Sequence, residues 1–202
     1  MPLTKRAQAW LATLQRETPL STAHVERLIV DAGRTPHAVW LDFHDRFAGF
    51  IEEVGPGDIA VWGLARAVDA DPPRAWIPPE DVFIRPADGE LPEVIRCADA
   101  HPVHEFELAA DGWFAGIGGP CPSFDMKVER HGVLHEFFLR GRARRTVVKD
   151  GDAAERGKLI HGLAPWLIVE ASSNDTQFFL TPARLVQYTP GLDQILRSET
   201  EP

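Results

Sequence analysis

The sequence lacks long apolar runs and has very few cysteines. None of its apolar runs approaches the roughly 18 to 20 residues that a helix needs to cross a bilayer. The first residues, MPLTKRAQAWL, also lack the apolar core of a secretion signal. Cys97 and Cys121, the 2 cysteines in a chain of 202 residues, make no disulfide framework, so we expect free thiols in a reducing compartment. These absences predict a soluble cytoplasmic protein.

Motifs of catalytic and cofactor sites are missing as well. The glycine-rich stretch 116–119 has neither the lysine nor the hydroxyl of a phosphate-binding loop, and Cys121 has no neighbouring sequence typical of a nucleophile. The basic run 140–145, RGRARR, has no aromatic residue between its arginines, which argues against nucleic-acid binding. We therefore predict no catalytic residues, no cofactor, and no nucleic-acid or membrane partner.

The histidines raise the question of a metal site. His131 and His135 would share one face of a helix, but Gly132 and the alternation around it predict a hairpin. In an extended strand the two imidazoles would stand about 13 Å apart, too far for one zinc ion. We expect ordinary polar histidines here, with a bound metal as the less favoured alternative. His44 lies on an apolar stripe, where a packed histidine is expected rather than a general base.

Helical periodicity is present over the first 49 residues. Apolar residues recur at helical spacing over 3–14 and, after a cap at Ser21 or Thr22, over 25–32. A third helix is expected to start at Thr35-Pro36 and to end at Gly49, which reaches the left-handed conformation that closes helices. Its buried stripe is predicted to contain Trp40, Phe43, His44, Phe47 and Ile51.

From residue 50 onward the pattern is typical of strands. Residues 50–54 and 59–66 flank a turn at 55–58, and Asp111-Gly112 predicts another tight turn. His131-Gly132 predicts a third, which would pair residues 124–130 with 133–139. Further strands are predicted at 81–85, 94–97, 103–108, 113–115, 166–170 and 177–180, with a strand edge near 146–148 and a helix at about 153–163.

This order of elements predicts a single α+β domain over residues 1–202. Residues 1–49 form its helical third, and residues 50–180 form a largely antiparallel sheet with a proline-rich segment packed over it. Thr181-Pro182 and Thr189-Pro190 each join a cap residue to a proline, so two short helices are expected within 181–197. Residues 198–202 are expected to be a disordered tail.

The acidic charge is concentrated in one part of the chain. The net charge is −9, and residues 51–111 alone hold 14 acidic and 4 basic residues. A surface of this sign repels nucleic acid and anionic lipid, and it attracts basic partners. The alternative is that the acidic loops only keep the protein soluble.

Two stretches resemble the SUKH superfamily. The sequence RFAGF at 46–50, preceded by WLDF at 40–43, is similar to the aromatic and glycine signature that ends a helix in that family. HEFELAADGWFAGI at 104–117 resembles its strand, turn and strand. The resemblance covers about residues 20–185 and implies an α+β protein without enzymatic activity, most often an immunity protein that binds a bacterial toxin and covers its active site.

The first functional hypothesis is therefore a cytoplasmic immunity protein with a toxin domain, basic in charge, as its partner. The candidate contacts are acidic residues and two aromatic anchors: Glu52, Glu53, Asp58, Trp62, Asp88, Glu90, Glu105, Glu107 and Trp113. The alternative is an enzyme or a small-ligand-binding protein. Its pocket would be lined by tryptophans and histidines: Trp62, Trp76, Trp113, His44, His104 and His135.

Overall fold

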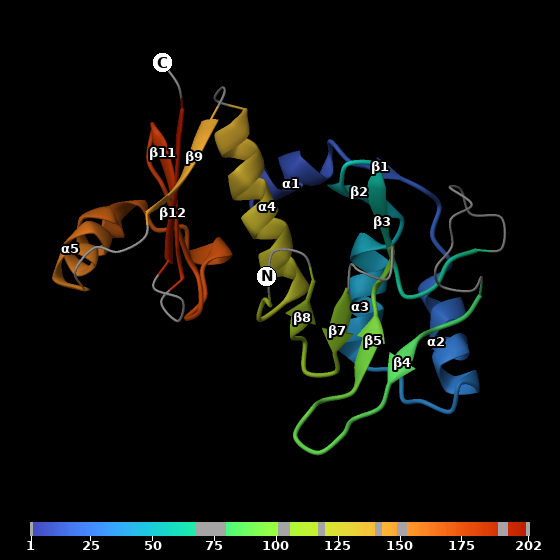
Figure 1. The fold of residues 1–202 in the computed structure, drawn as a ribbon. Helices are drawn as coiled ribbons and strands as arrows, with labels where there is room; N and C mark the ends of the chain where they lie inside the picture. The colour runs from blue at the N-terminus through green and yellow to red at the C-terminus, as the bar shows by residue number, and fades with distance from the viewer. Residues whose placement is uncertain are drawn as a thin grey trace. The chain divides into compact units, whose positions relative to one another are not determined.

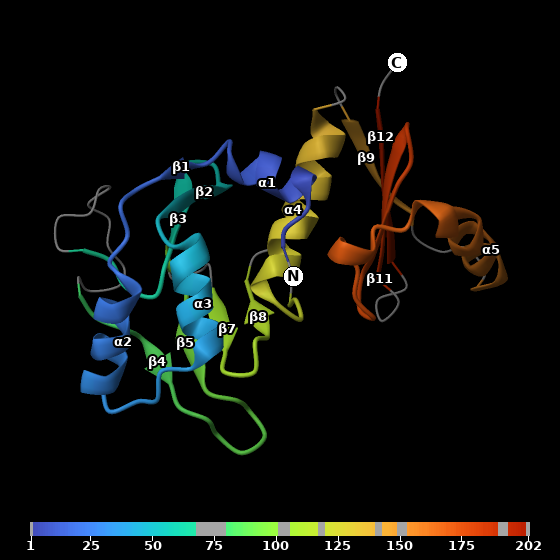
Figure 2. The ribbon, with the colours of Figure 1, turned by 180° about the vertical axis from the view of Figure 1, so that it is seen from behind.

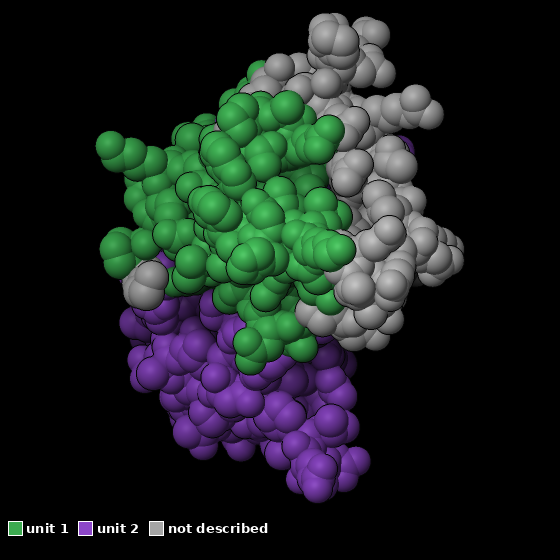
Figure 3. Space-filling view, turned by 90° about the vertical axis from the view of Figure 1, so that its left-hand side faces the viewer, with its two compact units in different colours: residues 1–12, 125–202 green, residues 13–124 purple. Residues whose placement is uncertain are grey.

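The computed structural model describes residues 2–67, 80–100, 106–116, 120–139, 143–148, 153–189 and 194–200. The chain is α+β, as the order of elements predicted, and all strand pairings among these residues are antiparallel. It divides into two compact units: unit 1 comprises residues 1–12 and 125–202, and unit 2 comprises residues 13–124 (Figure 3). Whether the two units fold as the single domain that we expected stays a prediction.

Unit 2 begins with two helices that confirm the sequence prediction. Helix α2 (Thr22–Asp31) is capped by Ser21, whose hydroxyl accepts the amide of His24. Helix α3 (Ala38–Phe47) begins later than expected, with His37 at the cap position in place of Thr35 and without a side-chain cap bond. Its buried face holds the predicted stripe of Trp40, Phe43, His44 and Phe47, whereas Ile51 lies in the following strand.

Two four-stranded sheets make up the rest of unit 2. The first has the order β1-β2-β3-β6 and consists of β1 (Gln15–Arg16), β2 (Phe50–Gly55), β3 (Asp58–Trp62) and β6 (Ala98–Ala100). The second has the order β4-β5-β7-β8 and consists of β4 (Ile84–Arg85), β5 (Val94–Arg96), β7 (Glu107–Ala109) and β8 (Phe114–Ala115). Helix α3 lies behind β5 and β7 in Figure 1 and in front of them in Figure 2, so it covers one face of the second sheet.

The strands predicted at 50–54, 94–97 and 113–115 are confirmed as β2, β5 and β8. Those predicted at 59–66 and 81–85 are shorter in the structure, since β3 ends at Trp62 and β4 covers only Ile84–Arg85. The Asp111-Gly112 turn is confirmed too, with Gly112 at a φ of 99°. Part of the strand expected at 103–108, and residues 68–79 of the proline-rich segment, lie outside the described residues. Strands β1 and β6 were not foreseen. The chain changes from one sheet to the other at Cys97, whose amide donates to Phe106 and whose carbonyl accepts from Gly63.

The core of unit 2 is aromatic and centres on Phe124. Its ring lies 4.6 to 5.0 Å from the ring centroids of Phe43, Phe47, Trp62 and Phe114. These partners come from α3, β3 and β8, so a single side chain joins the helix to both sheets. Aromatic packing of this kind stabilises through its large buried area and its edge-to-face contacts.

Unit 1 is a sheet between two helices (Figures 1 and 2). The sheet has the order β10-β11-β12-β9. Phe178 and Leu185 pack toward Val133 and Phe137 of one helix, while Phe179 packs toward residues of the other, because side chains alternate along a strand. The elements are α1 (Lys5–Leu11), α4 (Phe124–Phe138, with Phe124 in unit 2), α5 (Ala153–Leu163), β9 (Ala143–Val148), β10 (Gln177–Leu180), β11 (Arg184–Thr189) and β12 (Gln194–Thr200).

The hairpin predicted over residues 124–139 is wrong, because these residues form helix α4. Gly132 suggested a turn, but it lies inside the helix, where α1 approaches closely. A Cβ at Gly132 would stand 2.7 Å from the Cα of Ala7. Glu129 of α4 also binds the start of α1, since its carboxylate accepts hydrogen bonds from both the amide and the hydroxyl of Thr4, at 2.7 and 2.6 Å. The glycine therefore marks a helix contact and not a reversal of the chain.

Three predictions near the C-terminus are also wrong. The two short helices expected within 181–197 are replaced by β11 and β12. Thr181 holds a hairpin turn, since its hydroxyl accepts the amide of Arg184 at 2.9 Å, so the Thr-Pro pair served a turn instead of a helix start. The expected disordered tail is paired with β9 as far as Thr200. Residues 166–170, expected as a strand, form no continuous strand: they overlap two short 3₁₀ segments, η1 (Ala164–Trp166) and η2 (Val169–Ala171), and between these Leu167 makes a single bridge to Phe179.

Candidate functional site

Four of the predicted acidic contacts lie on two hairpins of unit 2. Glu53 and Asp58 belong to the β2–β3 hairpin, where Glu53 is exposed and Asp58 is half-buried. Asp88 and Glu90 belong to the loop between β4 and β5, and both are exposed. The structure thus brings four of the predicted contact residues to the surface in two pairs.

Two of the predicted contacts are buried and correct that part of the hypothesis. Glu52 is 5% exposed and Trp62 is 1% exposed. The indole Nε1 of Trp62 donates to the Glu52 carboxylate at 3.0 Å. Because neighbouring residues in a strand point to opposite faces, Glu52 turns into the unit while Glu53 turns outward. Glu52 and Trp62 therefore support the core and do not offer a surface to a partner.

Three predicted contacts remain: Glu105, Glu107 and Trp113. Glu107 in β7 is half-buried and pairs with Arg85 in β4 at 2.6 Å. Trp113, in the β7–β8 hairpin, is 43% exposed. Glu105 lies outside the described residues.

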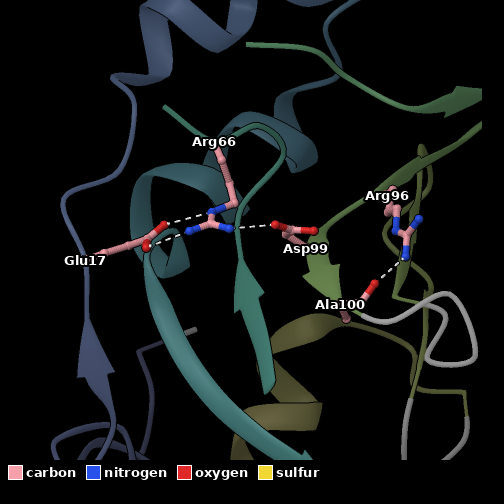
Figure 4. A network of polar contacts seen from close by, with 5 residues as sticks. All are labelled: Glu17, Arg66, Arg96, Asp99 and Ala100. Atoms are coloured by element: carbon pink, nitrogen blue, oxygen red, sulfur yellow. Dashed lines mark hydrogen bonds and ion pairs between the residues drawn. The ribbon is translucent and has the colours of Figure 1, made fainter. Parts of the chain in front are cut away.

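Unit 2 also contains a buried ionic network that was not predicted (Figure 4). The guanidinium of Arg66 donates to both carboxylate oxygens of Glu17, at 3.2 and 3.1 Å, and to Asp99 at 2.7 Å. The side chain of Arg66 is 4% exposed and that of Asp99 is fully buried. Burial acts to lower the pKa of Arg66, but its bonds to Asp99 and Glu17 outweigh burial and raise the pKa, so the guanidinium stays charged.

This network ties together three segments that are distant in the sequence. Glu17 follows β1, Arg66 follows β3 and Asp99 lies in β6. The Arg66 guanidinium therefore links segments that belong to three strands of the first sheet. No local pattern relates positions 17, 66 and 99, and an arginine in a loop ordinarily suggests a solvated side chain. The only sequence signal was an aspartate within the otherwise apolar run Cys97–Ala100.

His44 has no nitrogen left for catalysis. Its Nε2 donates to the carbonyl of Leu20 at 2.9 Å, and its Nδ1 accepts the amide of Leu64 at 3.2 Å. Burial lowers the pKa of His44, despite opposing contributions from Leu20 and Asp45, so the ring is neutral at pH 7. The prediction of a packed histidine is confirmed. Of the other residues proposed for a ligand pocket, Trp76 and His104 lie outside the described residues.

His131 and His135 share one face of α4, as residues four apart on a helix do. Within the described part of the chain, no group of three or more His, Cys, Asp or Glu side chains could hold a metal ion. His131 instead stacks on Trp10, with ring centroids 4.6 Å apart. Burial, Lys127 and Arg130 lower the pKa of His131 well below its ordinary value.

Mild acid is expected to destabilise the protein through His44 and His131. Both have a pKa below 6.5 in the folded chain, so the unfolded chain binds more protons as the pH falls below 6.5. Each histidine then removes up to about 1.4 kcal/mol of stability per pH unit, until the pH reaches its folded pKa. Urea unfolding at pH 7.5, 6.5 and 5.5 measures this loss.

Two variants test whether His131 contributes to this loss of stability. His131→Gln is expected to flatten the pH dependence below 6.5, whereas His161→Gln, at an exposed position of α5, is expected to leave it unchanged. Equal slopes for the wild type and His131→Gln would contradict the assignment to His131.

Comparisons with protein-family models, with curated proteins and with solved structures found no match. The resemblance to the SUKH superfamily thus stays a prediction. No helix among the described residues is long and apolar enough to cross a membrane.

Proposed function

We propose that the chain is a non-enzymatic immunity protein that neutralises a bacterial toxin by covering its active site with the acidic surface of unit 2. One observation carries this proposal: residues 13–124 hold 19 acidic and 8 basic residues, a net charge of −11, and no lysine. The rest of the chain has 11 acidic and 13 basic residues, a net charge of +2. The acidic excess therefore belongs to one unit.

The basic groups of unit 2 do not balance the exposed carboxylates. Arg34, Arg46, Arg66 and Arg85 each form an ion pair with an acidic residue of the same unit. Glu53, Asp88 and Glu90 remain exposed on the two hairpins. A surface of one sign attracts an oppositely charged partner over a Debye length and raises the encounter rate. A toxin that acts on nucleic acid is basic around its active site, which such a surface matches.

The test uses the toxin domain encoded beside this chain, with binding followed by stopped-flow and calorimetry. Asp88→Lys/Glu90→Lys and Glu53→Lys are expected to slow association by about tenfold or more at low salt, with a smaller difference at high salt. The toxin's activity should be inhibited by the wild type and less so by these variants.

A matched control lies in unit 1. Glu170 and Asp175 are exposed there, and Glu170→Lys/Asp175→Lys changes the net charge by the same amount as Asp88→Lys/Glu90→Lys. The control is expected to bind like the wild type. Equal affinity in all variants, or no binding of the wild type, would count against the proposal.

A further inference from the structure

The β4–β5 hairpin exposes apolar side chains as well as acids. Phe83 and Leu91 are each 59% exposed, the largest values among the large apolar side chains described in unit 2. Phe83 adjoins β4, whose backbone pairs with β5 on one side, and β4 is the edge of its sheet among the described strands. Large apolar side chains at a sheet edge are costly in water unless a partner covers them.

The tip of this hairpin is held in one conformation. The amide of Asp88 donates to the carbonyl of Leu91 at 3.2 Å, and the amide of Leu91 donates back to Asp88 at 3.0 Å. Gly89, at a φ of 58°, makes the reversal of the chain possible. At the base, the amide of Arg96 donates to the carbonyl of Phe83 at 2.9 Å. An ordered hairpin loses little conformational entropy when it binds.

The charge around these side chains is negative. Asp81, Asp88 and Glu90 are exposed on the same hairpin. Arg85 is neutralised by Glu107 at 2.6 Å. The hairpin therefore carries both exposed apolar side chains and carboxylates that no described arginine pairs.

We propose that this hairpin, residues 81–96, is the element that docks onto a basic protein partner. Lysine or arginine side chains of the partner meet Asp88 and Glu90, and an apolar part of its surface covers Phe83 and Leu91. This inference names the docking element for the proposed function and rests on that function for the identity of the partner. The two kinds of residue have separate roles: the carboxylates set the rate of association, and the apolar anchors set the rate of dissociation.

The first experiment needs no toxin. A displayed library of random 12-residue peptides is selected on the wild type and, in parallel, on Phe83→Ser/Leu91→Ser. The expected result is a family of peptides that combine Lys or Arg with apolar residues and that bind the double variant at least about tenfold more weakly. Val30→Ser, which removes a 54% exposed side chain of α2, is expected to keep their binding. No enriched family, or one that binds all variants equally, overturns the proposal.

The second experiment uses the toxin domain encoded beside this chain. Phe83→Ser/Leu91→Ser is expected to dissociate about tenfold faster with a nearly unchanged association rate, and amide exchange in the complex is expected to slow within residues 81–96. Tight binding with protection elsewhere would overturn the hairpin assignment and leave the immunity function standing. Absence of toxin binding together with hairpin-directed peptides would overturn the immunity function and leave the hairpin as a docking element.

Discussion

Replacing Arg66 by methionine is expected to lower the free energy of unfolding by about 3–5 kcal/mol, because it breaks a buried ion pair by removing one of its two charges. Asp99 is fully buried and accepts from Arg66 at 2.7 Å. Methionine has a similar length but no charge and no donor, so the buried Asp99 carboxylate loses the hydrogen bond and the ion pair that Arg66 gives it. Urea unfolding of the two proteins at pH 7.5 measures the difference.

Arg85 provides the matched control for this prediction. Its pair with Glu107 is as short, at 2.6 Å, but the Arg85 side chain is 52% exposed. Solvent screens such a pair, so Arg85→Met is expected to cost at most about 1 kcal/mol. Similar losses for Arg66→Met and Arg85→Met would show that burial does not decide the strength of these pairs, and the account of the network would then be wrong.

Gly49→Ala is expected to lower the free energy of unfolding by about 2–5 kcal/mol. This loss has two causes, left-handed backbone strain and a steric clash. Gly49 has a φ of 86°, and a Cβ there would stand 2.3 Å from the backbone oxygen of Glu17. The clash is with backbone, so a rotamer change cannot relieve it. The backbone must therefore move, which disturbs two hydrogen bonds of Gly49. The amide of Glu17 donates to the carbonyl of Gly49 at 2.9 Å, and the amide of Gly49 donates to the carbonyl of Trp62 at 2.7 Å.

Gly33 separates the two contributions. It has a φ of 73°, and a Cβ added to it would meet nothing within 4 Å. Gly33→Ala should therefore show the backbone strain alone, about 1–2 kcal/mol. If Gly49→Ala cost no more than Gly33→Ala, the close approach of Glu17 would have no energetic consequence.

The two large effects meet at Glu17. Its backbone touches Gly49, and its side chain holds Arg66. A substitution that displaces Glu17 already weakens the ionic network, so the double variant Gly49→Ala/Arg66→Met is expected to lose less stability than the two single losses together. Additive losses would mean that the network and the glycine contact are independent.

The elements predicted correctly have signals that neighbouring residues carry. Ser21 caps α2 because a side-chain oxygen three residues before an amide can reach it, whatever the rest of the chain does. Asp111-Gly112 turns because glycine accepts a positive φ. The apolar stripe of α3 and the span of α5 follow from periodicity in the same way.

The wrong predictions share one cause, which is that a residue type suits more than one structure. Gly132 serves a close helix contact, although glycine also suits turns. Thr181-Pro182 serves a hairpin, although the same pair begins helices. Which use applies depends on the segment packed against the residue, and that segment is α1 in the first case and β11 in the second.

The candidate site shows the same division. Charge counting found the acidic part of the chain, since net charge does not depend on the fold, and it found Glu53, Asp88 and Glu90. It could not distinguish Glu52 from Glu53, because strand alternation leaves open which of two neighbours faces inward. It missed the Glu17–Arg66–Asp99 network altogether, because these residues meet only after β1, β3 and β6 have paired.

The sequence by itself determined the α+β class, the helical start, the tight turns and the acidic character of residues 51–111. Each depends on composition or on residues within one turn of each other. The tertiary structure decided the division into two units, the helical state of α4, the burial of Glu52 and Trp62, and the partners of Arg66. These depend on contacts between distant segments, whose energies local patterns do not contain.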